Sequence, residues 1–231
     1  MRKRRRGLKS SAAARDIGIR ILSSDLEPRS RIAGEVEASE GMRMSRTTYR
    51  EAVRILVAKG LIETRPRFGA RVAAVEHWHL LDREVMSWVA SSGAEHKYRA
   101  ALIEFSELFE PEAVCLAAVR RNAAQLAQLK VLVSQINSLL ASSSERKDAM
   151  GELRKLMGRA SGNQTISYLV EAIVLGCQFP PPIGAILGRY SALLRAVESA
   201  DGVNARNHMR LILEDMALTL QQGSPGLAET R

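Results

Sequence analysis

The spacing of apolar positions predicts helices along most of the chain. Between residues 12 and 23 the apolar side chains fall on one face of a short amphipathic helix that ends before Pro28. A second, weaker helix is expected across residues 34–40. A third follows Ser45, which has a side chain suited to an N-cap. Its apolar residues recur with the spacing of a buried helical stripe: Tyr49, Ala52, Val53, Leu56 and Val57.

After Gly60 the pattern changes from helical to strand-like. Residues 61–73 read LIETRPRFGARVA, in which a short apolar run, a turn around Pro66 and Gly69, and alternating positions predict a small β-hairpin. Three arginines lie at or near the tip of this hairpin: Arg65, Arg67 and Arg71. Three helices followed by a cationic hairpin are typical of a winged helix-turn-helix.

The segment over residues 76–89 is too apolar for a free linker. Its tryptophans and aliphatic residues are expected to dock on a domain, because contiguous apolar side chains are rarely left in solvent. His77 and His79 stand two apart in this segment, but no further metal-ligating side chain completes a set around them. We therefore expect a polar linker edge there and not a metal centre.

From residue 98 onward the pattern predicts consecutive helices joined by polar, Gly- or Pro-containing loops. Their expected ranges are 98–119, 123–141, 146–160, 164–177, 183–200 and 202–222. The expected fold class is mainly α, with an N-terminal winged helix-turn-helix and a C-terminal antiparallel all-α bundle. The expected domains are a basic disordered arm (1–9), a DNA-binding domain (10–75), a docking linker (76–94), a helical domain (95–222) and a flexible tail (223–231).

The net charge of +9 is concentrated in the first third of the chain. Residues 1–75 hold 18 Lys and Arg against 8 Asp and Glu, whereas residues 76–231 hold 16 against 17. This asymmetry indicates a polyanion partner for the N-terminal part, because each Lys or Arg placed on a phosphate releases a condensed counterion. The basic run over residues 1–9 is either a solvated tail or an arm that follows DNA.

Other classes of protein are disfavoured by the sequence. Cys115 and Cys177 belong to no CxxC or Cys/His cluster, and no stretch approaches the length of apolar chain that crosses a membrane. We therefore expect a cytoplasmic protein without a signal peptide or a membrane span. GxSxG, HExxH and Gly-rich phosphate loops are absent from the sequence, so we do not expect an enzyme.

The chain resembles the DNA-binding domain of the GntR family of transcription regulators. The likeness lies in SRTTYREAVRIL, from Ser45 to Leu56, and in the wing sequence PRFGARV that ends at Val72. The resemblance implies a homodimer on a palindromic double-stranded operator. Relatives often carry an arginine where Val36 and Glu37 stand, which implies one DNA contact fewer here. The DNA-binding residues that it implies are Ser45, Arg46, Thr47, Thr48, Arg50, Arg65, Arg67 and Gly69.

The C-terminal part resembles the FCD ligand-binding domain of FadR-type GntR regulators. The likeness lies in residues 107–129 and in ASGN at 160–163. The pattern W-x-x-LD-x-x-V-x-x-W, from Trp78 to Trp88, resembles the branch that responds to sugar acids such as galactonate. The residues that this resemblance implies for an effector site are Ser106, Arg154, Asn163 and Tyr190.

FCD domains usually hold a divalent metal with an aspartate and three histidines. In this chain those positions correspond to Met150, Arg154, Tyr190 and Ile212, so we expect no metal and no cofactor. Arg154 then either neutralises an effector carboxylate directly or is a solvated arginine beside a decayed pocket.

The expected function is that of a sequence-specific DNA-binding repressor whose operator affinity is modulated by a small carboxylate such as a sugar acid. The alternative is a DNA-binding dimer with a decayed ligand site that senses no small molecule.

Overall fold

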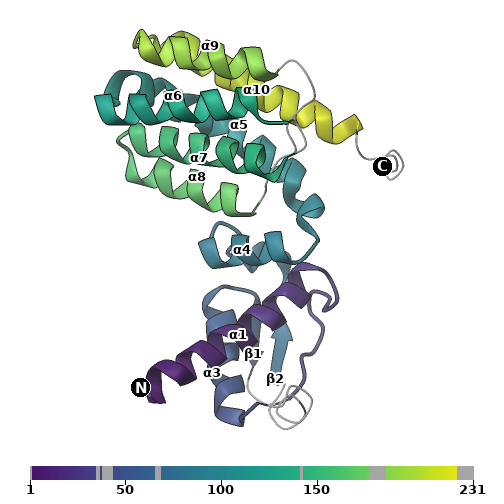
Figure 1. Ribbon diagram of the computed structural model, residues 1–231. Coiled ribbons are helices and arrows are strands. Elements are labelled where there is room, and N and C mark those ends of the chain that lie inside the picture. Colours follow the sequence, from purple (N-terminus) through teal and green to yellow (C-terminus); the bar gives the residue numbers. More distant parts are fainter. Residues whose placement is uncertain are drawn as a thin grey trace. The chain divides into compact units, whose positions relative to one another are not determined.

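The computed structural model divides the chain into two compact units, residues 1–95 and 96–231 (Figure 1). Within the described ranges no helix combines the length and the hydropathy that crossing a membrane requires. The structure describes residues 2–34, 37, 44–65, 69–140, 143–176 and 186–222.

The first unit is a winged helix-turn-helix, as the hydrophobic pattern predicted. Its elements are α1 (Arg2–Leu22), α3 (Arg46–Ala58), β1 (Ile62–Arg65), β2 (Gly69–Val72), the short 3-10 helix η1 (Val75–His77) and α4 (Arg83–Ser91). Helix α1 packs against α3, and the hairpin of β1 and β2 follows α3 directly (Figure 1). Between them these two helices bury a compact apolar core: Ile17, Ile21, Leu22, Tyr49, Ala52 and Leu56.

Helix α1 begins earlier than the apolar pattern predicted. The basic run over residues 1–9 was expected to be disordered, whereas α1 begins at Arg2. Arg and Lys are good helix formers and no proline interrupts the run, so the backbone continues the helix toward the N-terminus. The helix expected over residues 34–40 lies, apart from residues 34 and 37, outside the described ranges.

The two strands pair in an antiparallel register that sets the face of each wing residue. Ile62 lies opposite Val72, and both are buried against the helices. Arg65 lies opposite Gly69, which has a φ of +77°. This left-handed conformation favours glycine at the start of β2, and a side chain at that position would be strained.

The segment over residues 29–32 pairs with β2 and adds a third edge to this hairpin. The N–H of Val72 donates to the carbonyl of Ser30 at 2.9 Å. Arg31 and Arg71 form an antiparallel bridge beside this bond. The edge was not predicted, because so short a polar stretch has no apolar alternation of its own.

Helix α4 docks the linker onto the winged unit. Its N-cap is Asp82, whose carboxylate accepts hydrogen bonds from the N–H groups of Glu84 and Val85. Trp88 is buried against α1 at Gly18, where a Cβ would lie 2.5 Å from the indole ring. Gly18 is thus needed for the close approach of the two helices.

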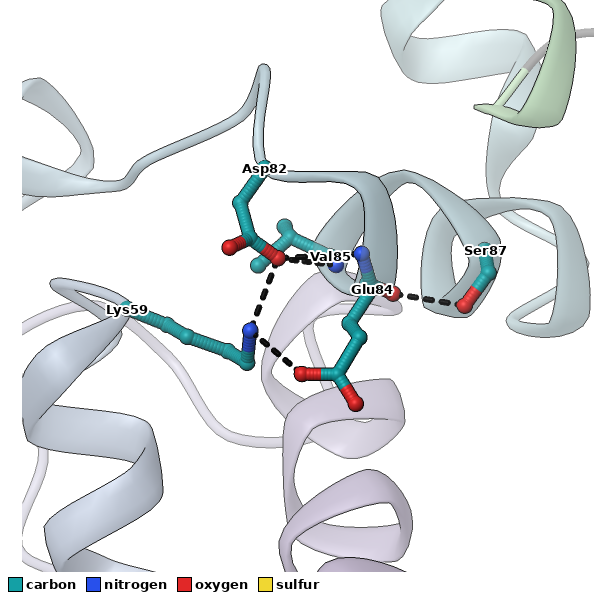
Figure 2. Close-up of polar contacts among 5 residues, drawn as sticks. All are labelled: Lys59, Asp82, Glu84, Val85 and Ser87. Carbon is teal, nitrogen blue, oxygen red and sulfur yellow. Dashed lines mark hydrogen bonds and ion pairs between the residues drawn. The ribbon is translucent and has the colours of Figure 1, made fainter. Parts of the chain in front are cut away.

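Lys59, the residue that caps the C-terminus of α3, ties α3 to α4 (Figure 2). Its Nζ lies 2.7 Å from a carboxylate oxygen of Asp82 and of Glu84, and 5.4 Å from the centroid of a Trp88 ring. Burial alone lowers the pKa of Lys59, but the hydrogen bonds to the two carboxylates outweigh burial and raise this pKa. The ion pairs therefore hold the linker helix to the end of the predicted DNA-reading helix.

The second unit is an all-α bundle, in agreement with the predicted fold class. Its helices are α5 (Glu95–Arg120), α6 (Ala123–Ser138), α7 (Ser144–Ala160), α8 (Gln164–Gly176), α9 (Ile186–Glu198) and α10 (Gly202–Gln222). The helices α8, α7, α6 and α9 follow one another across the bundle, and α10 packs on α9 (Figure 1). Helix α5 contacts both α7, through Glu110 and Arg154, and α10, where Gly202 closely approaches Cys115.

Candidate nucleic-acid interface and buried polar cluster

The N-terminus of α3 is held by a side-chain cap. Ser45 is the N-cap, and its hydroxyl oxygen accepts a hydrogen bond from the N–H of Thr48 at 3.1 Å. The two hydroxyl groups of Ser45 and Thr48 also lie 2.8 Å apart, within hydrogen-bonding distance. Thr48 is 6% exposed, so the structure speaks against the direct DNA contact expected of this residue. Its role is to fix the first turn from which Arg46 projects.

One face of α3 presents arginine side chains to solvent. Arg46, Thr47 and Arg50 are exposed, whereas Tyr49 and Ala52 face the core. Arg46 makes no hydrogen bond or ion pair with any residue that the structure describes. A helix whose exposed, capped N-terminus carries an uncommitted guanidinium group matches the element that helix-turn-helix proteins insert into the major groove.

A basic groove of about 330 Å³ lies between α3 and the wing. Arg50 and Arg54 contribute to it from α3, and Arg65 contributes from β1. Arg31 joins them from the third edge of the hairpin. Sequence analysis did not select Arg31, because only the backbone pairing of its segment brings it to this groove. Four arginines in one hollow form a surface suited to phosphate oxygens.

The wing supplies part of the expected interface. Arg65 is exposed, with its Nη2 3.4 Å from a carboxylate oxygen of Glu63. No heavy atom lies within 4 Å of the position that a Cβ of Gly69 would take, so its backbone conformation, and not a lack of space, favours glycine. Arg67, the remaining wing residue among the predicted contacts, lies outside the described ranges.

The helical bundle contains a buried ion pair between α5 and α7. Arg154 is 4% exposed and Glu110 is 2% exposed. The Arg154 Nε donates to Glu110 at 2.9 Å, and its Nη2 donates to the other oxygen of the same carboxylate. The hydroxyl of Ser106 lies 3.4 Å from Nη2. Arg154 is therefore not a solvated arginine. Its charge is already compensated by Glu110, so it is not reserved for an effector carboxylate.

Two polar groups near this ion pair have no partner among the described residues. The hydroxyl of Tyr190 and the Nε of Arg146 are buried without a hydrogen bond in this part of the chain. Burial raises the pKa of Tyr190 well above its ordinary range, against the opposing effect of nearby Arg154. Arg146 and Arg154 are two helical turns apart with Met150 between them, so all three lie on one face of α7.

A cavity of about 200 Å³ lies beside the same face of α7. Met150 and Arg154 line it from α7, Val174 from α8 and Met216 from α10. Ile212 is fully buried in α10. Within the described ranges no three His, Cys, Asp or Glu side chains gather in a way that would hold a metal ion.

Asn163 does not belong to this cluster, contrary to expectation. It is exposed, and its side-chain oxygen accepts hydrogen bonds from the N–H groups of Thr165 (3.0 Å) and Ile166 (3.2 Å). Gly162 before it has a φ of +69°. The ASGN motif is thus the junction that ends α7 and caps α8.

Comparison with known proteins identifies a matching domain family and two curated relatives. Residues 101–215 match the FCD domain family. The HTH-type transcriptional regulator YieP of Escherichia coli K12 is 35% identical over 130 residues, which is 56% of this chain and 56% of that protein. The galactonate operon transcriptional repressor of the same organism is 33% identical over 131 residues, 57% of this chain and 56% of that protein. The chain spans just over half the length of the curated relatives it matches.

Solved structures share the fold at low sequence identity. A GntR protein of Streptococcus agalactiae superposes with a TM-score of 0.53 and 21% identity, covering 91% of this chain and 99% of that chain. Lar, which controls expression of the agr system in Listeria monocytogenes, superposes with a TM-score of 0.63 and 16% identity, covering 93% of this chain and 97% of that chain. The likeness extends over both units of the present chain.

Proposed function

We propose that the chain is a GntR-type transcription regulator with an FCD domain, which binds a specific palindromic operator as a homodimer and represses transcription there. The proposed function is that of a regulator and not of an enzyme, as the names of these relatives suggest. The observation that carries the proposal is Arg46, exposed and uncommitted at the capped N-terminus of α3. The basic groove beside α3 adds phosphate affinity to base reading.

The test is fluorescence anisotropy with DNA from upstream of the protein's own gene, against a scrambled duplex of the same length. We expect binding to the upstream fragment to be about a thousandfold tighter, or more, at physiological salt. This preference should persist as salt is raised, because base contacts release no counterions. Equal binding to both duplexes, lost together at high salt, would contradict sequence-specific regulation.

We further propose that the bundle binds a small carboxylate between α7 and α10. The support is a pair of buried donors, the Tyr190 hydroxyl and the Arg146 Nε, which have no partner among the described residues. Tyr190 interacts electrostatically with Arg146 and with Arg154, and Arg154 lines a cavity of about 200 Å³. With Glu110 compensating Arg154, the positive charge of Arg146 remains for an anion. The name of the galactonate operon repressor points to sugar acids as the first ligands to try.

A divalent metal does not fit this place in the bundle. Met150 and Ile212 offer no hard or imidazole donor, and Arg154 is a cation already paired with Glu110. We therefore propose that effector binding here needs no metal. The runner-up function is a DNA-binding dimer that senses no small molecule.

Thermal unfolding with a panel of sugar acids separates the two proposals. A ligand at 100 times its Kd should add about 2.7 kcal/mol to the folded state, which raises Tm by roughly 5–10 °C. Tyr190→Phe should be at least as stable as the parent without ligand, because it removes a buried hydroxyl that has no partner among the described residues. This variant should also lose part of the ligand-induced shift in Tm. EDTA should not change the Tm of the parent, either with or without ligand. If no sugar acid in the panel raises Tm, the result favours the dimer that senses no small molecule.

A further inference from the structure

The outer face of the wing carries two arginines that oppose each other across adjacent strands. Arg31 and Arg71 form an antiparallel bridge, and the backbone bond from Val72 to Ser30 fixes the pairing. Both side chains are exposed. Side chains in such a pair have Cβ atoms about 5 Å apart, and like charges placed directly opposite destabilise a sheet.

The neighbouring acidic residue has its ion pair with a different arginine. Glu63 is opposite Arg71 in the hairpin register, but the ion pair of its carboxylate is with Arg65. Within the part of the chain that the structure describes, neither Arg31 nor Arg71 makes a side-chain hydrogen bond or an ion pair. This row of the sheet therefore holds two arginines and one glutamate, and the carboxylate of that glutamate is paired with Arg65 outside the row.

The stability of the fold does not require positive charges at these two positions. Each side chain points to solvent, where threonine or another strand-forming residue would pair without electrostatic cost. Arg31 also lines the groove that holds Arg50 and Arg54 of α3. The positive surface is thus continuous from the DNA-reading helix to the outer face of the wing.

We propose that Arg31 and Arg71 form a clamp on the phosphates of DNA that flanks the bases read by α3. The inference rests on the proposed DNA-binding function. A DNA strand carries one phosphate about every 3.4 Å along the helix axis. When each guanidinium group lies on a phosphate, its charge is neutralised, and the repulsion between the two arginines is replaced by their attraction to the DNA. Contacts with phosphate add affinity and fix position but carry no sequence information.

The clamp predicts opposite effects of one change on folding and on DNA binding. Arg31→Gln with Arg71→Gln should leave Tm equal to or above that of the parent, because the like-charge pair is gone. The salt dependence of DNA binding should fall by about 1.8 in the slope of log K against log salt for each bound subunit. Binding at 0.1 M salt should weaken roughly 60-fold per bound subunit, equally for upstream and scrambled DNA.

Anisotropy titrations of the full chain between 50 and 300 mM salt test this on both duplexes. The matched control is Arg210→Gln, which removes one positive charge from an exposed position of α10 and should leave the slope unchanged. An unaltered slope in the Arg31/Arg71 variant would overturn the clamp, as would a loss confined to the upstream duplex. Failure of the regulatory proposal has a different signature, namely a parent protein that binds both duplexes alike, and the slope still decides the clamp in that case. A parent that binds neither duplex would overturn both.

Discussion

Replacing Arg46 with alanine is expected to abolish most of the preference for the operator while leaving the fold intact. The side chain is exposed and makes no polar contact with a described residue, so we expect its removal to leave no buried group unpaired. A bidentate arginine contact with guanine contributes about 1–3 kcal/mol of discrimination, or roughly 5- to 150-fold in affinity. In a homodimer the loss occurs in both half-sites, so the combined loss should be about 25-fold at the least.

Arg46→Lys is the matched control, because lysine keeps the charge but lacks the planar fork of donors. This variant should retain binding to scrambled DNA and its salt dependence, and still lose most of the preference for upstream DNA. The measurement is the ratio of the two dissociation constants by anisotropy, with Tm recorded for each variant. If Arg46→Ala kept the parental ratio, α3 would not be the element that reads bases.

The hydrophobic periodicity was sufficient to predict α3 and the wing. Of the predicted stripe Tyr49, Ala52 and Leu56 are buried, whereas Val53 is half-buried and Val57 is 39% exposed, so the buried face is narrower than predicted. Ser45 is the N-cap, as predicted. In the bundle the loop signals were equally informative, since Asn122 forms a capping box at the start of α6. These features depend on neighbours a few residues away, and they can therefore be predicted from the spacing of residues in the sequence.

Features set by tertiary contacts were not predictable in this way. The third edge of the hairpin forms because the backbone of Ser30 meets Val72, and nothing in the local pattern indicates that pairing. Thr48 was selected from a family resemblance as a DNA contact, yet its hydroxyl is used within the cap of α3. Both cases depend on where the chain folds back and not on residue type.

The buried ion pair is the clearest example of a tertiary contact that sequence spacing does not predict. Glu110 stands among other glutamates of α5, and no sequence spacing marks it as the one that is buried. Its partner Arg154 is 44 residues away on α7. The sequence shows Met150 and Ile212 at positions where the FCD resemblance places metal ligands, but it contains no indication of the ion pair that lies near them.

Glu110→Leu is expected to destabilise the bundle by about 3–5 kcal/mol, the second large effect. The substitution removes the carboxylate that receives two hydrogen bonds from Arg154, and leaves a buried guanidinium uncompensated. Arg154→Met should be comparably costly, because it leaves Glu110 charged and buried. Urea unfolding followed by far-ultraviolet circular dichroism measures both losses.

Tryptophan fluorescence gives an internal control, because Trp78 and Trp88 both lie in the first unit. If the two units unfold independently, the fluorescence transition should stay in place while the circular dichroism transition moves to lower urea. A loss below about 1 kcal/mol in both single variants would contradict a buried, bidentate pair and place it among exposed ion pairs instead.

The double variant Glu110→Leu/Arg154→Met separates stability from function. Replacing a buried ion pair by apolar side chains of similar volume is often neutral or stabilising, so this variant should regain most of the stability that each single change removes. If the pair serves only the fold, the double variant should respond to carboxylates as the parent does. If it orients Tyr190 and Arg146 toward a ligand, the restored protein should no longer show a ligand-induced rise in Tm, because the polar surroundings of those two groups would be gone.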